Sequence, residues 1–206
     1  RSGIFVFSPG ERTDAEIRGI FREAGSSFIV QEQIRQHPLI EQINPASVST
    51  IRVLSLLLED NFFIESAVLR VSSPDKPYVT VHDGGFYIEI REDGRLHPKA
   101  FENTGAWVDH GRGCYDDSFA MPSMHSIFDE VRRIHPRIAH FKCIGWDFAV
   151  DDHGDPVLIE FNAFPGLDCS QLTCCRPIFG DQTDWILEDF FLHRTWAQNH
   201  RQDILI

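Results

Sequence analysis

Apolar residues recur along this chain in short runs that predict an α+β fold. Four runs rich in apolar and β-branched residues, at about 49–59, 62–71, 78–82 and 86–91, are separated by short polar segments. Two of those segments, Glu59-Asp60-Asn61 and Glu92-Asp93-Gly94-Arg95, are typical of tight hairpin turns. The pattern therefore favours a mainly antiparallel sheet with flanking helices.

Three other segments have helical periodicity. The first begins at the capping box Thr13-Asp14-Ala15-Glu16 and ends before Gly25. A second runs from Ser123, as its N-cap, to about His135, and a third covers about 183–199. The first two helices have apolar faces that we expect to be buried: Ile17, Ile20, Phe21 and Ala24 in the first, and Met124, Ile127, Phe128, Val131 and Ile134 in the second.

Two further apolar runs, 144–150 and 157–162, flank the polar turn Asp-Asp-His-Gly-Asp-Pro and predict another β-hairpin. If residues 150 and 157 pair, Asp147 lies opposite Glu160, and side chains in such pairs are about 5 Å apart at Cβ. Asn162 lies two residues further on and points to the same face. Two carboxylates and an amide oxygen are ligands that suit Mg²⁺, which also keeps positions for phosphate.

A hairpin with acidic residues also fits a plain, solvated hairpin with structural polar groups. Against that interpretation, Glu160 and Asn162 interrupt a run of apolar residues. Isolated carboxylates on a hydrophobic strand are costly unless they are paired or bind a metal. From spacing and context alone, the metal site and the structural alternative stay equally open.

Composition excludes several classes of function. The 206 residues carry a formal net charge of −12, so a basic surface for nucleic acid is not expected. No apolar run is long enough to span a membrane. The five cysteines lack paired zinc-site spacing, which favours free thiols and a reducing cytoplasm. The sequence carries no indication of oligomeric state.

The hairpin motif resembles the metal-binding end of the ATP-grasp superfamily, in the sugar-transfer-associated, α-L-glutamate-ligase-related branch. The similar features are Gly-x-Asp ending at Asp147, Glu160 thirteen residues later, Glu-x-Asn ending at Asn162, and the pair Pro165-Gly166. The resemblance covers roughly residues 27–180. It implies an ATP-grasp fold in which Asp147, Glu160 and Asn162 hold Mg²⁺ between the ATP phosphates.

Residues 27–33 resemble the hinge of that family, where a strand edge pairs with adenine. The expected strand spans 27–31 and ends at Gln31 and Glu32. The resemblance implies that Gln31 accepts from the adenine amino group and that the backbone near Ile34 reaches the ring nitrogens. It also places His37, or Glu41, at the ribose. Taken alone, Gln31 and Glu32 fit a strand end at the surface.

Two arginines within apolar runs, Arg52 and Arg70, resemble the family's phosphate-facing arginines. A guanidinium suits this role because its fork matches phosphate oxygens and stays charged. The structural alternative is an arginine that reaches the surface or pairs with a local acid such as Glu65. The Gly-Gly pair at 84–85 is similar to a glycine element of the family, and fits a plain turn equally well.

The resemblance implies two parts: residues 1–38, a remnant of the small ATP-covering lobe and the hinge, and residues 39–206, the catalytic lobe. The chain begins with arginine and has no lysine before Lys76, so the N-terminal part of the fold, with its glycine-rich loop, is expected to be missing. The implied reaction is ATP-dependent ligation of a small-molecule carboxylate to an amine, with ATP and Mg²⁺ as cofactors. A kinase acting on a hydroxyl and a non-catalytic module stay open as alternatives.

Overall fold

The computed structural model describes residues 5–8, 10–59, 61–73, 84–102, 104–108 and 119–189. The chain divides into two compact units, residues 1–35 and 36–206, each of which is described by itself. Among the described residues, no helix has the length and apolar character needed to cross a lipid bilayer.

The first unit contains one helix, α1 (Asp14–Ala24). Its predicted capping box is confirmed: the Thr13 hydroxyl accepts from the Glu16 amide, and the Glu16 carboxylate accepts from the Thr13 amide over 2.8 Å. The predicted burial of its apolar face is wrong, because no residue of α1 is buried. Phe21 instead stacks on Phe28, with ring centroids 4.9 Å apart.

The strand expected at 27–31 is also wrong. Residues 27–35 are irregular, and Phe28, Ile29 and Val30 are exposed. A strand needs a neighbour to receive its backbone hydrogen bonds. The described residues of the first unit form no other strand, so this apolar run has no partner there.

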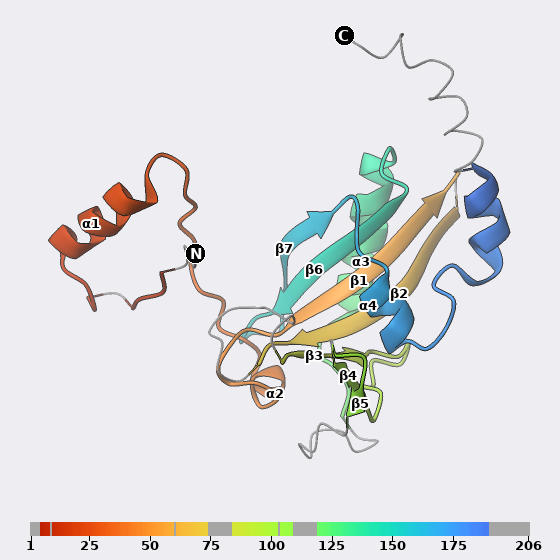
Figure 1. Cartoon of the computed structure of the whole chain (residues 1–206), viewed down its shortest axis with the longest axis horizontal. Coiled ribbons are helices and arrows are strands. Elements are labelled where there is room, and N and C mark those ends of the chain that lie inside the picture. Colours follow the sequence, from red (N-terminus) through yellow and green to blue (C-terminus); the bar gives the residue numbers. More distant parts are fainter. Residues whose placement is uncertain are drawn as a thin grey trace, which may run out of the picture. The chain divides into compact units, whose positions relative to one another are not determined.

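The second unit is built on a seven-stranded antiparallel sheet with the order β5-β4-β3-β2-β1-β6-β7 (Figure 1). The fold is therefore α+β, as predicted. The strands are β1 (Thr50–Leu58), β2 (Asn61–Val71), β3 (Phe86–Glu89), β4 (Ala100–Glu102), β5 (Trp107–Val108), β6 (Cys143–Val150) and β7 (Pro156–Asn162). The other elements are α2 (Pro38–Glu41), α3 (Met124–Ile134), α4 (Asp168–Thr173) and the 3-10 turns His135–Ile138 and Gly180–Gln182; residues 183–189 are also helical.

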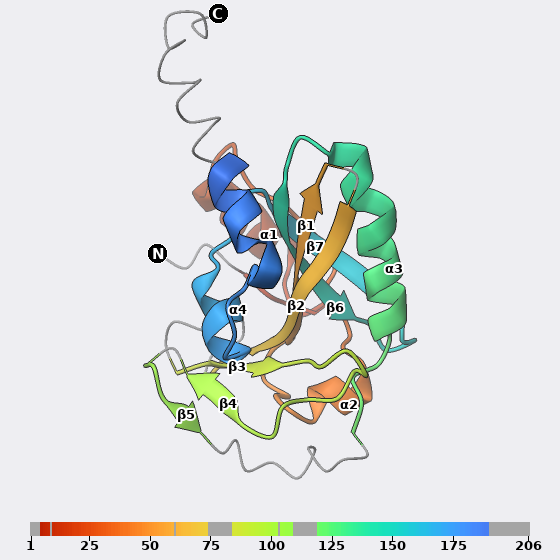
Figure 2. The same cartoon turned by 90° about the vertical axis from the view of Figure 1, so that its right-hand side faces the viewer.

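Side chains alternate between the two faces of this sheet, and a different helix covers each face (Figure 2). The face under α3, here called the α3 face, holds the main core, in which Met124, Ile127 and Val131 pack on strand residues such as Trp146 and Phe148. This burial confirms the predicted apolar face of that helix. The opposite face, here called the α4 face, has a smaller cluster of Val68, Tyr87 and Phe101 packed by Cys169 and Cys174.

The start of α3 differs from the prediction. Ser123 does not cap the helix with its side chain; it has a positive φ of 63°, and its hydroxyl donates to the carbonyl oxygen of Gly154. Ser123 thus ties the start of α3 to the β6–β7 turn, a contact between distant segments that no local pattern encodes. The expected strand at 78–82, residues His82 and Asp83, and the end of the last helix after residue 189 lie outside the described residues.

One polar network lies within the main core. The Trp146 indole donates to the Ser55 hydroxyl over 2.8 Å, and that hydroxyl lies 2.8 Å from Nδ1 of His135. Nε2 of His135 lies 2.8 Å from the Phe141 carbonyl oxygen. All these groups are satisfied if His135 is neutral and protonated at Nε2, with the Ser55 hydroxyl donating to Nδ1. His135 is therefore structural.

Candidate functional site

The predicted hairpin exists as β6 and β7, and its register differs from the expected one. Val150 pairs with Pro156 rather than with residue 157. A bulge then shifts the ladder, because Phe148 pairs with Leu158 whereas Asp147 pairs with Glu160. The predicted juxtaposition of Asp147 and Glu160 is therefore confirmed, although a regular ladder from the observed turn would not produce it.

The amide side chain also lies on the expected face. Asn162 pairs with Gly145, two residues before Asp147, so its side chain shares the α4 face with the two carboxylates. Hard oxygen donors on three neighbouring positions suit Mg²⁺. The residues present thus fit the metal that the sequence motif implied.

The burial argument used for Glu160 is wrong. Strand β7 is the outer strand of the sheet, and Leu158, Ile159, Glu160 and Phe161 are all exposed. An apolar run on an edge strand need not be buried, and a carboxylate there stays solvated at little cost. Asp147, on the next strand inward, is buried. The burial cost therefore applies to Asp147 alone.

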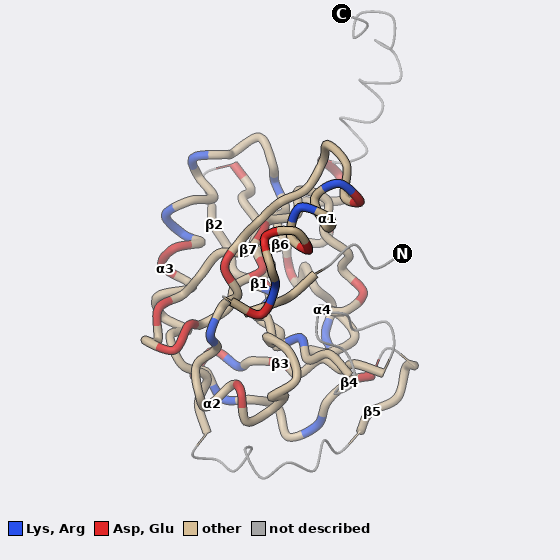
Figure 3. Tube along the Cα trace, turned by 90° about the vertical axis from the view of Figure 1, so that its left-hand side faces the viewer, with Lys and Arg blue, Asp and Glu red and all other residues tan. Residues whose placement is uncertain are grey.

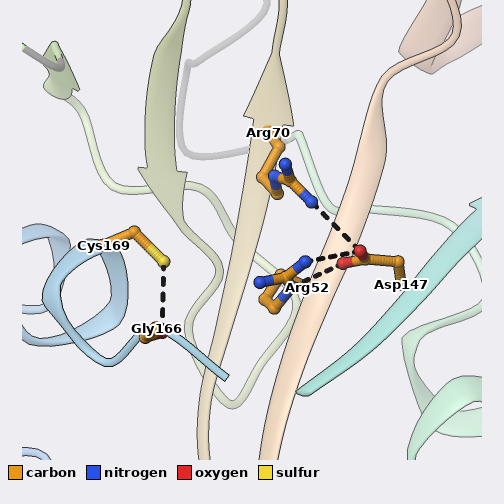
Figure 4. Close-up of polar contacts among 5 residues, drawn as sticks. All are labelled: Arg52, Arg70, Asp147, Gly166 and Cys169. Atoms are coloured by element: carbon orange, nitrogen blue, oxygen red, sulfur yellow. Dashed lines mark hydrogen bonds and ion pairs between the residues drawn. The ribbon is translucent and has the colours of Figure 1, made fainter. Parts of the chain in front are cut away.

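Two arginines pair with Asp147, as Figure 4 shows. Arg52 lies directly opposite Asp147 in the β1–β6 ladder and binds both carboxylate oxygens, with Nε to Oδ1 over 2.6 Å and Nη2 to Oδ2 over 2.5 Å. Arg70 reaches from β2, with Nη1 3.1 Å from Oδ2. The acid that pairs with both arginines is therefore Asp147 and not Glu65, the example that the sequence suggested. Instead, the Arg176 side chain donates to the backbone carbonyl oxygen of Glu65.

These contacts favour the charged form of Arg52. Burial on its own lowers the pKa of the Arg52 guanidinium, but the hydrogen bonds and charge of Asp147, with the charge of Glu160, raise this pKa above its ordinary value. A bidentate arginine–carboxylate pair is also the strongest geometry for such a contact. Asp147 and Glu160 thus supply two negative charges beside the two positive charges of Arg52 and Arg70.

Gly145 makes room for this arrangement. A Cβ atom at this position would lie 2.9 Å from Cβ of Pro165 and 3.3 Å from Cδ of Arg52. The first distance is shorter than real side chains tolerate, and the second leaves little space for the arginine stem. The glycine of the Gly-x-Asp motif and the proline after β7 therefore pack on each other and on Arg52.

Sequence reasoning missed two residues next to the arginines. Tyr87 on β3 pairs with Arg70, and Cys169 on α4 lies near Tyr87 and Arg52. Burial raises the pKa of the Tyr87 hydroxyl, and burial also raises the pKa of the Cys169 thiol, although Arg52 and Arg70 partly oppose the latter shift. No local motif marks either residue. Tyr87 lies here because β3 pairs with β2, and Cys169 lies here because α4 packs on this face of the sheet.

The residues predicted to bind adenine and ribose are divided between the two units. Gln31, Glu32 and Ile34 belong to the irregular part of the first unit, outside the sheet that carries the cluster. His37 belongs to the second unit, where its amide donates to the Val150 carbonyl over 2.9 Å and its ring nitrogen Nδ1 accepts from the Leu39 amide over 3.2 Å. His37 thus caps α2 next to the end of β6.

Within the described ranges, one set of three His, Cys, Asp or Glu side chains has its potential ligand atoms mutually close: Asp151, Asp152 and His153. This group lies in the β6–β7 turn, where Asp151 accepts from the amides of His153 and Asp155 over 3.0 and 2.8 Å. Asp152 contacts His153 over 2.8 Å. These bonds are those of an Asx-type turn and explain the group without a metal.

The comparisons agree with the motif. The family model described as sugar-transfer associated ATP-grasp matches residues 6–183. A search of curated proteins found no match, and neither did a search of solved structures. The matched segment includes α1, the hinge-like residues, both arginines and the complete β6–β7 hairpin. The chain therefore belongs to the sugar-transfer-associated ATP-grasp family.

Proposed function

We propose that this protein is an ATP- and Mg²⁺-dependent ligase that joins a small-molecule carboxylate to an amine through an acyl phosphate. ATP-grasp domains are in general ATP-dependent enzymes that use Mg²⁺. The observation that supports the proposal most directly is the pairing of Asp147 with Glu160 next to Arg52, on one face of the sheet. Free thiols in the described part of the chain fit a cytoplasmic protein.

Asp147, Glu160 and Asn162 are the residues that would hold the metal. Their donor set is oxygen only, with two carboxylates and one amide, which matches the preference of a hard divalent cation. When bound, Mg²⁺ supplies neutralisation of the phosphate charge. Glu160 is exposed on the edge strand, so its carboxylate is accessible to a metal ion from solvent.

Arg52 and Arg70 would orient the transferring phosphoryl group and stabilise its charge. Guanidinium groups match phosphate oxygens geometrically and remain charged throughout. In the first half of the reaction, a substrate carboxylate oxygen attacks the γ-phosphorus and ADP leaves. In the second, an amine attacks the acyl carbon, phosphate leaves and an amide forms. Stabilisation of this kind is the main contribution a protein makes to phosphoryl transfer.

The chemistry needs no protein nucleophile. Cys169 is the nucleophilic side chain next to the arginines, and its raised pKa keeps the thiol protonated near neutral pH. A protonated thiol is a poor nucleophile. For adenine and ribose, we propose Gln31, Glu32, the backbone near Ile34 and His37, as the family resemblance implied.

A non-catalytic module is the second candidate, and one observation favours it. Asp147 is satisfied by Arg52 and Arg70 without any ligand, as a structural ion pair would be. A kinase that acts on a hydroxyl differs from the ligase in its acceptor alone. In the same assay the kinase forms a different product and the module forms none.

The test measures ADP formation from ATP and Mg²⁺ with panels of sugar acids and amino acids as carboxylates, with amines, and with polyols. The ligase hypothesis requires ADP formation that depends on both a carboxylate and an amine, and transfer of ¹⁸O from the labelled carboxylate to phosphate. ADP formation with a polyol alone supports the kinase. Absence of ATP binding by calorimetry supports the module. The Asp147→Asn variant is the matched control for metal-dependent turnover.

A further inference from the structure

The carboxylate proposed as the inner metal ligand already accepts three hydrogen bonds from arginine side chains. Three guanidinium N–H groups point at Asp147: two from Arg52, over 2.6 and 2.5 Å, and one from Arg70, over 3.1 Å. The Asp147 side chain is only 4% exposed. An ionised carboxylate has about four lone-pair positions. Both positions on Oδ2 are occupied and the side chain is almost fully covered, so a metal ion gains open access to Asp147 only when an arginine side chain moves.

The charges around Asp147 also disfavour binding of a metal ion on its own. The two guanidinium charges lie on one carboxylate, and Glu160 is the other negative charge that acts on Arg52. The two guanidinium charges thus offset the two carboxylates, so a bare divalent cation gains little net attraction at Asp147 while the arginines stay in place. The negatively charged phosphates of a nucleoside triphosphate would be attracted by the same two guanidinium groups.

We propose that Arg52 and Arg70 form an electrostatic latch on Asp147, so that the site takes up a polyanionic nucleotide before, or together with, its metal. The phosphates draw guanidinium groups away from Asp147, and the released carboxylate then becomes available to the cation. This inference rests on the proposed function, because it concerns the same nucleotide–metal site. Its content is an order of binding, which membership of the family does not specify.

The two halves of the latch are unequal. Arg52 makes both bonds of the bidentate pair, and its stem packs next to Gly145. Arg70 makes one longer bond, and its side chain is more exposed, at 20% against 12% for Arg52. The geometry therefore assigns Arg70 as the half that moves first, while Arg52 stays in place.

The deciding measurement is the affinity for Mn²⁺ without nucleotide, read by electron paramagnetic resonance of the free ion. Removing a positive charge that blocks Asp147 should strengthen this binding. We expect Arg70→Met to bind Mn²⁺ alone about tenfold more tightly than the wild type, within the usual range of coupling between sites. The same variant should bind ATP less tightly in calorimetry with EDTA present.

Arg132→Met is the matched control. Arg132 lies on α3, at the opposite face, where it pairs with Asp129 on its own helix over 3.0 Å. Charges of both signs are interspersed along the chain in Figure 3, and the net charge of −12 attracts cations without specificity. The control removes one positive charge from that background, and we expect it to leave Mn²⁺ affinity unchanged. Arg70→Lys retains the charge and should stay closer to the wild type than Arg70→Met.

The outcomes separate the latch from the proposed function. Equal Mn²⁺ affinity in the wild type, Arg70→Met and Arg132→Met, together with tight binding of Mg²⁺–ATP by the wild type, overturns the latch and leaves the proposed function standing. No binding of Mg²⁺–ATP by the wild type overturns both. If Arg70→Met loses its circular-dichroism melting transition, Arg70→Gln decides, because it also removes the charge: Mn²⁺ affinity above the wild-type value supports the latch, and affinity equal to or below that value contradicts it.

Discussion

The α3 face of the sheet is packed almost entirely from apolar side chains, whereas the α4 face carries two arginines and two carboxylates on its central and outer strands. On the α3 face, the buried Trp146, Ser55 and His135 satisfy one another. On the α4 side, the buried hydroxyls of Thr50, Ser66 and Thr173 have no hydrogen-bond partner within the described part of the chain. Unsatisfied buried groups cost free energy. The α3 face therefore supplies most of the apolar burial, and the α4 face holds the paired charges.

The largest test of this division is Trp146→Ala. Trp146 is fully buried on the α3 face, and its indole donates to Ser55. Truncating a buried aromatic residue costs about 3–5 kcal/mol, from lost contacts and the cavity left behind. Urea unfolding followed by circular dichroism should show this loss. A change below about 1 kcal/mol would mean that the α3 face is not the stabilising core.

The next largest effect is expected from Asp147→Asn on the α4 face. The amide keeps the shape of the side chain but removes the charge that pairs with both arginines. Hydrogen bonds to charged groups contribute about 1.5–3 kcal/mol, so unfolding free energy should fall by about that amount, and less than in Trp146→Ala. Binding of Mg²⁺–ATP and any turnover should be lost. Unchanged turnover in a folded variant would contradict the metal assignment.

Gly145→Ala tests how closely the α4 face is fitted around Arg52. The added methyl group would lie 2.9 Å from Pro165 and 3.3 Å from the arginine stem, so either must move. Overpacking of this kind costs about 1–3 kcal/mol. We expect weaker ATP binding together with a lower melting temperature. Gly19→Ala in α1, where the new methyl group would have no neighbour within 4 Å, is the control and should leave ATP affinity unchanged.

The smallest effect is a pH dependence that comes from the α3 face. Burial lowers the pKa of the His135 imidazole, while the bond to Phe141 raises it and nearby Lys142 lowers it. His135 therefore stays neutral in the native state where the unfolded chain, with a pKa near about 6.5, takes up a proton. Stability from this residue is present above about pH 6.5 and falls as pH decreases below it, by at most about 1.4 kcal/mol per unit.

His135→Gln isolates the contribution of this imidazole to the pH dependence, because carboxylates elsewhere in the protein also titrate at low pH. Urea unfolding at pH 5 and pH 7.5 should show a smaller loss on acidification in the variant than in the wild type. The variant should also be less stable at both values, because it breaks the contact with Ser55. Equal pH slopes for the two proteins would contradict a buried, neutral His135.

Sequence reasoning reached the pairing of Asp147 with Glu160 because strand alternation and a polar turn are local signals. It missed the bulge at Ile159, because a bulge depends on how the edge strand meets its neighbour. It named Arg52 and Arg70 through family resemblance, but their meeting at Asp147 needed the order of the strands. The predictions for Ser123 and for the run at 27–31 were wrong for a related reason. The hydrogen-bond partner of Ser123 and the backbone conformation of 27–31 depend on which segments lie next to them.

The bulge on β7 has a consequence for how this hairpin can vary. Side chains alternate along a strand, so a one-residue slip moves every later side chain to the opposite face. From the observed turn, a regular ladder would place Ile159 opposite Asp147 and turn Glu160 toward the apolar core. The unpaired Ile159 shifts the later residues of β7 by one position, which returns the Glu160 side chain to the same face as Asp147. A turn longer or shorter by one residue therefore keeps the carboxylates together only if the bulge is moved or lost to compensate.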